Sequence, residues 1–158
     1  MVSVVLVCVA LDQLSKALVM ACLERGQQVV IVPKFFNLTL HFNKGAAFGL
    51  FSNLADGQRQ VAITVTTLLA LGCVVFLLIK DYLSDPLGQT ALAMVFGGAL
   101  GNIVDRLRFG EVVDFLDFHY AGYHWPAFNL ADSLICIGVL ILLFKRPSGR
   151  QEKKEKVP

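Results

Sequence analysis

The sequence predicts an all-α membrane protein with four transmembrane helices, a small extracytoplasmic β-sheet and a second extracytoplasmic loop. Three observations lead to this fold class. Of the 158 residues, 56% are hydrophobic and 16% are charged, whereas soluble chains are about half apolar and about a quarter charged. Four apolar segments are each long enough to cross a bilayer, which takes roughly 20 residues of helix. Their spacing leaves two longer connections, and both would lie on one side of the membrane.

The four apolar segments lie at about residues 2–23, 61–79, 87–104 and 127–144. The second contains no charged residue and ends before Lys80. The third carries the run GGALG, whose small side chains favour close helix packing in lipid. A cleaved signal peptide at the start is disfavoured, because the first segment lacks a basic start, holds two charges and shows no clear cleavage site. We therefore expect four retained helices.

The distribution of basic residues predicts the orientation of these helices. Six of the fourteen Lys and Arg residues fall in the last 14 positions, and loops rich in such residues stay in the cytoplasm. Four spans place both termini on that side, so the connections at about 24–60 and 106–126 are expected outside. Residues 1–146 would form a single membrane domain, and residues 147–158 a polar basic cytoplasmic tail.

The first outer connection is predicted to contain the β-sheet, over about residues 28–58. Its runs VVIVP and FFNLTLHF are rich in β-branched and aromatic residues, and the second run partly alternates between apolar and polar positions. We expect this small sheet to rest on the outer surface of the membrane.

The net charge, the cysteines and the histidines argue against several kinds of partner. A net charge of +2 is too small to indicate nucleic-acid binding. The four cysteines lie in apolar runs and are expected to be small buried hydrophobic side chains. They are Cys8, Cys22, Cys73 and Cys136. The three histidines lack the spacing of metal ligands, and they are His41, His119 and His124. We therefore expect no metal, no other cofactor and no disulfide.

Two ionisable residues lie inside the first apolar segment, where such groups are costly and mark either a buried pair or a function. Asp12 and Lys16 are four residues apart, acid before base, which places them on one helix face in the favourable order for an ion pair. The pair could neutralise itself and position the helix, or it could orient a nearby site. Direct chemistry by Asp12 is disfavoured.

A second polar group ends the third apolar segment. Asn102 and Arg106 share a helix face, and Asp105 lies one turn from Asn102. Asp105 is expected to tie the helix end together with Arg106. Asn102 and Arg106 could instead project donors into a cavity, where the guanidinium would suit a carboxylate or a peptide carbonyl.

Two further carboxylates flank the second outer connection. Asp114 lies between Val113 and Phe115, so it is either an ordinary surface acid or a group in a water-poor site with a raised pKa. Asp132 follows Asn129 by three residues, a pattern typical of a helix start. Topology brings both acids to the same membrane boundary, where two carboxylates could share one proton and activate a water.

Other classes of function stay open on these residue types alone. A proton-conducting transporter would need a relay of acids across the bilayer, whereas three of the four candidate acids cluster at one outer boundary. These four are Asp12, Asp105, Asp114 and Asp132. In a catalytically inert assembly factor, each acid would be only a cap or an ion-pair partner. Glu111 and Asp117 are interpreted as ordinary boundary charges.

Five short motifs run in order through nearly the whole chain. They are DQLSK at 12–16, NKGAAF at 43–48, GGALGNIVDR at 97–106, VVDF at 112–115 and FNLAD at 128–132. Together they resemble the motifs of lipoprotein signal peptidase (signal peptidase II), a bacterial family of membrane aspartyl peptidases. Members of that family often carry a few more residues before the first span, so the start of this chain could be trimmed or assigned too late in the sequence.

The resemblance implies an activity and a set of site residues. Enzymes of this family remove signal peptides from diacylglyceryl-modified prolipoproteins by cutting before the lipidated lipobox cysteine. The catalytic residues would be Asp114 and Asp132, which would activate a water without a covalent intermediate. The residues that bind substrate or inhibitor would be Asn43, Asn102, Arg106 and Asn129. Structural support would come from Asp12, Lys16 and Asp105.

The resemblance also implies a location and partners. The protein would be a multi-pass protein of the bacterial cytoplasmic (inner) membrane, with both termini in the cytoplasm and the active site near the outer (periplasmic) face. Its partners would be diacylglyceryl-prolipoprotein substrates, membrane lipids and inhibitors of the globomycin type. It would act as a monomer and bind no nucleic acid.

Overall fold

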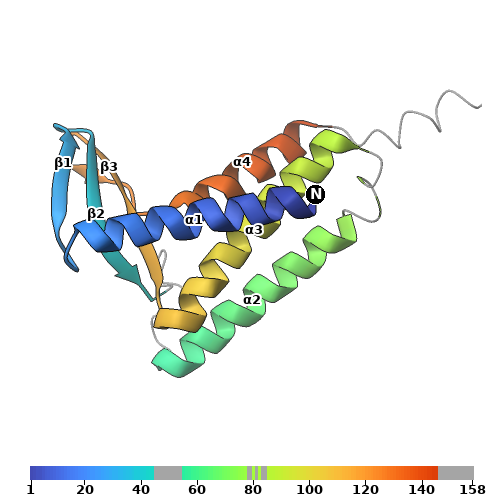
Figure 1. Ribbon diagram of the computed structural model, residues 1–158, viewed down its shortest axis with the longest axis horizontal. Helices are drawn as coiled ribbons and strands as arrows, with labels where there is room; N and C mark the ends of the chain where they lie inside the picture. The colour runs from blue at the N-terminus through green and yellow to red at the C-terminus, as the bar shows by residue number, and fades with distance from the viewer. Residues whose placement is uncertain (45–54, 78–79, 81, 83–84, 146–158) are drawn as a thin grey trace, which may run out of the picture.

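The computed structural model describes the chain except for residues 45–54, 78–79, 81, 83–84 and 146–158. The predicted tail and most of the NKGAAF motif therefore lie outside the described residues. Four helices are present in the part of the chain that the structure describes. They are α1 (Val2–Cys22), α2 (Asp56–Leu77), α3 (Pro86–Phe109) and α4 (Leu130–Phe144) (Figure 1).

The described residues also form one antiparallel sheet, with the strands in the order β1-β2-β3-β4. The strands are β1 (Gln28–Val32), β2 (Phe36–Asn43), β3 (Val112–Tyr120) and β4 (Tyr123–His124). The sheet lies at the end of the helices far from the N-terminus (Figure 1). The prediction of strands in the first outer connection is confirmed for β1 and β2.

The second outer connection was predicted as a loop, and that prediction is wrong, because the segment forms β3 and β4. β3 pairs with β2 from Phe36 opposite Phe118 to Asn43 opposite Val112, so the backbone groups at the inner edge of β2 find partners. Val113 and Phe115 of β3 pack with Val19 of α1. The strand is thus stabilised by long-range contacts that are absent from its local sequence.

The third helix is longer than its apolar segment. The Asp85 side chain accepts a hydrogen bond from the Leu87 backbone N–H (3.2 Å), and the helix ends at Gly110 with φ of 73°. The predicted span stopped at residue 104, because hydropathy falls at Asp105. A charged residue does not break a helix, and Arg106 in the last turn suits the negative end of the helix dipole.

α3 is the central helix, since it packs against α1, α2 and α4. Glycines permit the close approach of α3 and α4. A Cβ atom added at Gly98 would lie 2.5 Å from the Ala131 carbonyl oxygen, and one added at Gly138 would lie 2.6 Å from the Ala91 carbonyl oxygen. The small residues of α3 therefore bring the start of α4 against its surface, as the GGALG run predicted.

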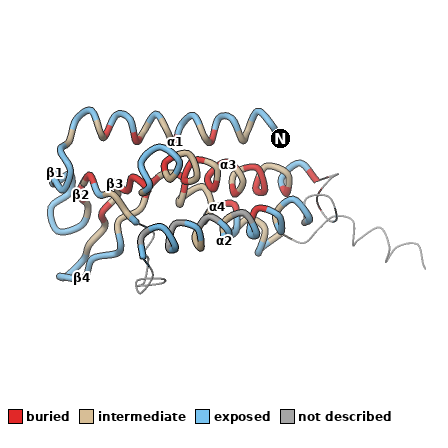
Figure 2. The backbone as a smooth tube through the Cα atoms, turned by 90° about the horizontal axis from the view of Figure 1, so that it is seen from below, coloured by how far each residue is buried: buried red, intermediate tan, exposed pale blue. Residues whose placement is uncertain are grey.

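Apolar side chains are exposed on the outward faces of the helices. Figure 2 shows buried residues concentrated along α3 and β3, while much of α1 and α2 is exposed. Leu6, Leu14 and Leu18 of α1 and Leu143 of α4 are each more than half exposed. Such an arrangement suits lipid, which solvates apolar surface on the outside of a helix bundle.

The exposed apolar surface also explains one wrong prediction. Of the four cysteines, Cys8 alone is buried, whereas Cys22, Cys73 and Cys136 are exposed, and all four are free thiols. An apolar run in a membrane helix has outward as well as inward positions, so apolar neighbours did not imply burial.

Two described helices, α1 and α3, are long and apolar enough to cross a membrane by length and composition. Shorter apolar helices cover Val61–Phe76 and Leu130–Phe144. That all four helices cross the membrane stays a prediction.

Candidate active site

A cluster of polar side chains lies buried where the helices meet the sheet. Each of its central members has at most 7% of its surface exposed. They come from α1 (Asp12, Lys16), α3 (Asn102, Asp105), β3 (Asp114) and the start of α4 (Asn129). Buried polar groups need hydrogen-bond partners, and these side chains form hydrogen bonds with one another.

Asp114 lies on β3 with 1% of its surface exposed. Its carboxylate accepts two hydrogen bonds from neutral amides, from Asn43 Nδ2 (2.9 Å) and from Asn129 Nδ2 (2.7 Å). Burial raises the pKa of Asp114 to about 7, against the effect of these hydrogen bonds, and the nearby charge of Asp132 adds to the rise. The group can therefore hold a proton near neutral pH.

Asp132 lies in the first turn of α4 and has two functions in the fold. Its Oδ2 accepts a hydrogen bond from the Asn129 backbone N–H (3.3 Å), while the Asn129 side chain accepts one from the Asp132 N–H (3.0 Å). This reciprocal capping box starts the helix. The other carboxylate oxygen, Oδ1, accepts a hydrogen bond from Asn102 Nδ2 (2.8 Å). The residue is thus both a helix cap and a member of the polar cluster.

Asn129 connects the two carboxylates. Its side-chain amide donates to Asp114 and also to Asn102 Oδ1 (3.2 Å), while its backbone N–H donates to Asp132. The side chain is fully buried, so its orientation is set by these partners. The structure thereby brings Asp114 and Asp132 into one hydrogen-bonded network through Asn129 and Asn102.

Lys16 of α1 joins this network through Asn102. Its Nζ lies 2.8 Å from Asp12 Oδ2, 2.7 Å from Asp105 Oδ2 and 3.1 Å from Asn102 Oδ1. Because an ammonium only donates hydrogen bonds, it must face the oxygen of the Asn102 amide. The amide nitrogen of Asn102 is consequently turned toward Asp132.

Asp12 and Asp105, the two partners of Lys16, also form hydrogen bonds with α4, β3 and α1. Asp12 Oδ1 accepts a hydrogen bond from the backbone N–H of Ala131 (3.0 Å), next to Asp132. Asp105 accepts hydrogen bonds from the Val113 backbone N–H (3.1 Å), next to Asp114, and from the side chain of Gln13 (2.8 Å). Each support aspartate therefore holds the backbone beside one of the two candidate catalytic aspartates.

Asp105 forms a salt bridge with Lys16 of α1, a partner that its local sequence did not indicate, and its tie to Arg106 at the helix end stays a prediction. Arg106 is half-buried, and its charge interacts with Asp132, Asp105 and Asp114. The contribution of Gln13 was missed by the sequence reasoning. Its signal was a polar residue inside an apolar helix, directly between Asp12 and Lys16 in sequence.

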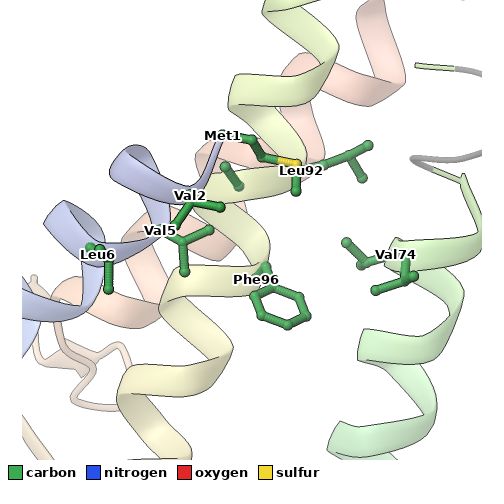
Figure 3. Close-up of a pocket in the computed structure, with 9 residues that line it drawn as sticks. Met1, Val2, Val5, Leu6, Val74, Leu92 and Phe96 are labelled. Atoms are coloured by element: carbon green, nitrogen blue, oxygen red, sulfur yellow. The ribbon is translucent and has the colours of Figure 1, made fainter. Parts of the chain in front are cut away.

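An apolar cavity of about 380 Å³, lined by residues at the start of α1, lies at the end of the helices away from the sheet (Figure 1), and Figure 3 shows its lining. α1 contributes Val2 and Val5, α2 contributes Val74, and α3 contributes Leu92 and Phe96. From Val5 to Asp12, α1 rises by about 10 Å. The cavity therefore lies about two turns of α1 from the polar cluster.

The arrangement is suited to acid–base chemistry. Two carboxylates share one network, and one has a pKa near neutrality, which is the condition for one acid and one base at the same pH. Three side chains that could hold a metal, Asp117, His119 and His124, lie further along the sheet and outside this cluster.

Comparison with known proteins identifies the family. The sequence model of the signal peptidase (SPase) II family matches residues 4–146. The chain is 51% identical over 138 residues to the lipoprotein signal peptidase of Syntrophotalea carbinolica, over 85% of this chain and 83% of the relative. It is 44% identical over 143 residues to that of Syntrophus aciditrophicus, over 90% of this chain and 89% of the relative.

The fold is also similar to that of a solved bacterial membrane enzyme, determined by the in meso method at 1.9 Å resolution. The TM-score is 0.76 and the sequence identity 35%, over 90% of this chain and 88% of the other. A second such enzyme, solved at 2.3 Å, has the same TM-score at 33% identity. The chain therefore belongs to the signal peptidase II family, a family of membrane proteases that act on lipoproteins.

Proposed function

We propose that this protein removes signal peptides from diacylglyceryl-modified prolipoproteins by cutting before the lipidated cysteine, with Asp114 and Asp132 as its catalytic pair. The observation that carries the proposal is the buried network that links these two carboxylates. Asp114 has neutral amide partners and a pKa near neutrality, and Asp132 lies in the first turn of the apolar helix α4.

The reaction needs one protonated and one ionised carboxyl group. Asp132, ionised, takes a proton from a water as the water oxygen attacks the carbonyl carbon of the scissile peptide. Asp114, protonated, gives its proton to the carbonyl oxygen, which forms a neutral tetrahedral diol. Collapse of the diol returns a proton to the leaving amine and breaks the C–N bond, so no covalent enzyme intermediate forms.

The raised pKa of Asp114 supports this division of roles, because burial keeps its carboxyl group protonated to a higher pH than an ordinary aspartate. Its hydrogen bonds with Asn43 and Asn129 hold the carboxyl plane, so its reacting oxygen is oriented before substrate binds.

Substrate backbone would be held by the polar side chains around the pair. Peptide groups that enter a lipid environment have no water to bind, so the enzyme must supply their partners. Amide and guanidinium groups are suited to this, and the same groups would hold globomycin-type inhibitors. They are those of Asn43, Asn102, Arg106 and Asn129.

The exposed apolar surfaces support a membrane arrangement for the helices. All four helices would cross the cytoplasmic (inner) membrane with both termini in the cytoplasm, which places the polar cluster near the outer face. Every residue of β1 is exposed, including Val30 and Ile31, and such an apolar strand is suited to rest on the membrane surface. The apolar cavity at the cytoplasmic end could hold part of the signal helix or an acyl chain.

The test is cleavage of a lipidated prolipoprotein by purified protein. Asp114→Asn and Asp132→Asn are each expected to lose cleavage, because neither amide can take or give the required proton. Glu111→Gln is the matched control. Glu111 lies outside the network and forms a salt bridge of 2.7 Å with the exposed Arg25. Substantial cleavage by either aspartate variant would remove that residue from the catalytic pair.

A further inference from the structure

Three potential metal ligands come together at the outer end of β3. Asp117 and His119 are two residues apart on this strand, so their side chains share a face. His124 lies directly opposite His119 on β4. Ala121 and Gly122, with φ of 50° and 85°, form the tight turn that reverses the chain between them. The hairpin therefore creates a grouping that spacing along the sequence did not indicate.

The three residues lie close enough to share one ion, and one of their distances is that of a metal site. One ligand atom from each residue can be chosen so that all three lie within 4.8 Å of one another. Asp117 Oδ1 lies 3.1 Å from His124 Nδ1. Two ligands of a tetrahedral zinc ion, each about 2.0–2.1 Å from the metal, are separated by about 3.3 Å. An ion could take the place of the shared proton between these two atoms.

The carboxylate is held in place by neighbours on the adjoining strands. Asp117 Oδ2 accepts hydrogen bonds from Gln28 Nε2 (2.6 Å) and Asn37 Nδ2 (2.9 Å), which leaves Oδ1 toward the imidazoles. The Asn37 amide nitrogen also lies 3.2 Å from His119 Nδ1. Hydrogen bonds that orient a ligand in this way are a regular feature of protein metal sites.

The two imidazole rings limit how an ion can bind. They are stacked, with centroids 4.8 Å apart and an angle of 12° between their planes. A metal lies near the plane of each ring that binds it, so one ring must turn about its Cβ–Cγ bond. The side chain of His124 is 57% exposed, which leaves room for that rotation. Both rings line a cavity of about 410 Å³, where water could supply a fourth ligand.

We propose that Asp117, His119 and His124 bind a divalent transition-metal ion, with zinc as the best fit to two imidazoles and one carboxylate. The ion joins β4 to β3 and so fixes the hairpin. The site is separate from the candidate catalytic pair, because three residues of strand place Asp117 about 10 Å from Asp114 along β3. This proposal differs from the sequence-based expectations that Asp117 is a boundary charge and that no metal is bound.

The test is titration of the purified full chain, with its affinity tag removed, by ZnCl2 in an isothermal calorimeter. One Zn²⁺ per chain is expected. Asp117→Asn, His119→Gln and His124→Gln should each weaken binding at least about tenfold, the lower range for loss of groups that support a metal. His41→Gln is the matched control, because His41 is the remaining histidine of the chain, and it should bind as the parent does.

A second measurement keeps the test valid if a variant folds poorly. Co²⁺ bound to the parent protein should give visible absorption typical of a four-coordinate site, and Zn²⁺ should abolish it. His124→Gln, on an exposed two-residue strand, should keep its helical circular dichroism while losing this absorption. The proposal would be overturned if the parent did not bind Zn²⁺, or if folded His124→Gln bound it as tightly as the parent. It would also be overturned if His41→Gln lost as much Zn²⁺ binding as the three ligand variants.

Discussion

Asp114 and Asp117 lie three residues apart on β3, yet their surroundings shift the pKa of the two carboxyl groups in opposite directions. Asp114 is nearly fully buried between neutral amides and close to another carboxylate, and burial raises its pKa to about 7. Burial alone would also raise the pKa of Asp117, but hydrogen bonds from Asn37 and His124 hold it below its usual range.

The difference shows how one strand can carry two kinds of carboxylate. At Asp114 the side chain faces the helix bundle, where Asn43 and Asn129 are its hydrogen-bond partners. At Asp117 the same strand has left the bundle and passes among imidazoles that can carry positive charge. A carboxyl group suited to proton transfer and one suited to binding a cation thus differ in their neighbours, and their residue type is the same.

Replacing each of these aspartates by asparagine should give the largest difference in cleavage rate between two variants. Asp114→Asn is expected to lower the cleavage rate by roughly 10²–10⁴-fold, the usual contribution of a general acid or base. Asp117→Asn should keep most of the parent rate, because its side chain lies outside the candidate site. Initial rates of cleavage of a lipidated prolipoprotein would measure the effect of each substitution. Circular dichroism would check that both variants are folded. Equal losses would mean that the two carboxylates do not differ in function.

Lys16→Met removes the buried ammonium that contacts the network. It should have the next largest effect, which is a loss of stability. The change would leave Asp12 and Asp105 buried without their shared ammonium. Breaking a buried ion pair on one side typically costs about 3–5 kcal/mol. Thermal unfolding in detergent should show a large fall in stability. Glu111→Gln, whose partner Arg25 is 64% exposed, should lower stability by no more than about 1 kcal/mol. Similar losses for both would argue against the buried support.

Asn43→Ala should give the smallest effect, seen as a shift of the pH profile. The hydrogen bond from Asn43 lowers the pKa of Asp114, so its removal should raise that pKa further. If Asp114 acts as the acid, activity falls as pH rises through its pKa, and the alkaline limb of kcat/KM should move to higher pH in the variant. A limb that moves to lower pH, or activity that rises with pH through 7, would assign Asp114 to the opposite role.

Much of this molecule was predictable because its signals are local. The start of α4 depends on Asn129 and Asp132, three residues apart, and the capping box forms as the pattern indicates. The pair of Asp12 and Lys16 lies within one turn and forms as its spacing predicts. Apolar segments of membrane length likewise carry their own evidence of helix, because each backbone group is satisfied within the helix.

Other features depend on contacts between distant segments. The second outer connection became β3 because β2 offers an edge for pairing, and Asp105 found its partner in Lys16 on another helix. The opposed positions of His119 and His124 follow from the hairpin turn. None of these partners lies within one helical turn in sequence, so residue type and spacing could not select among them.

By itself, the sequence determined the helices, the cap of α4, the family motifs and the set of polar residues available to a site. Tertiary structure alone decided which amide faces which carboxylate, and therefore that Asp114 and Asp132 share one network through Asn129 and Asn102. The physical reason is that a hydrogen bond depends on ångström-scale distance and direction. Packing of α1, α3, α4 and β3 sets both.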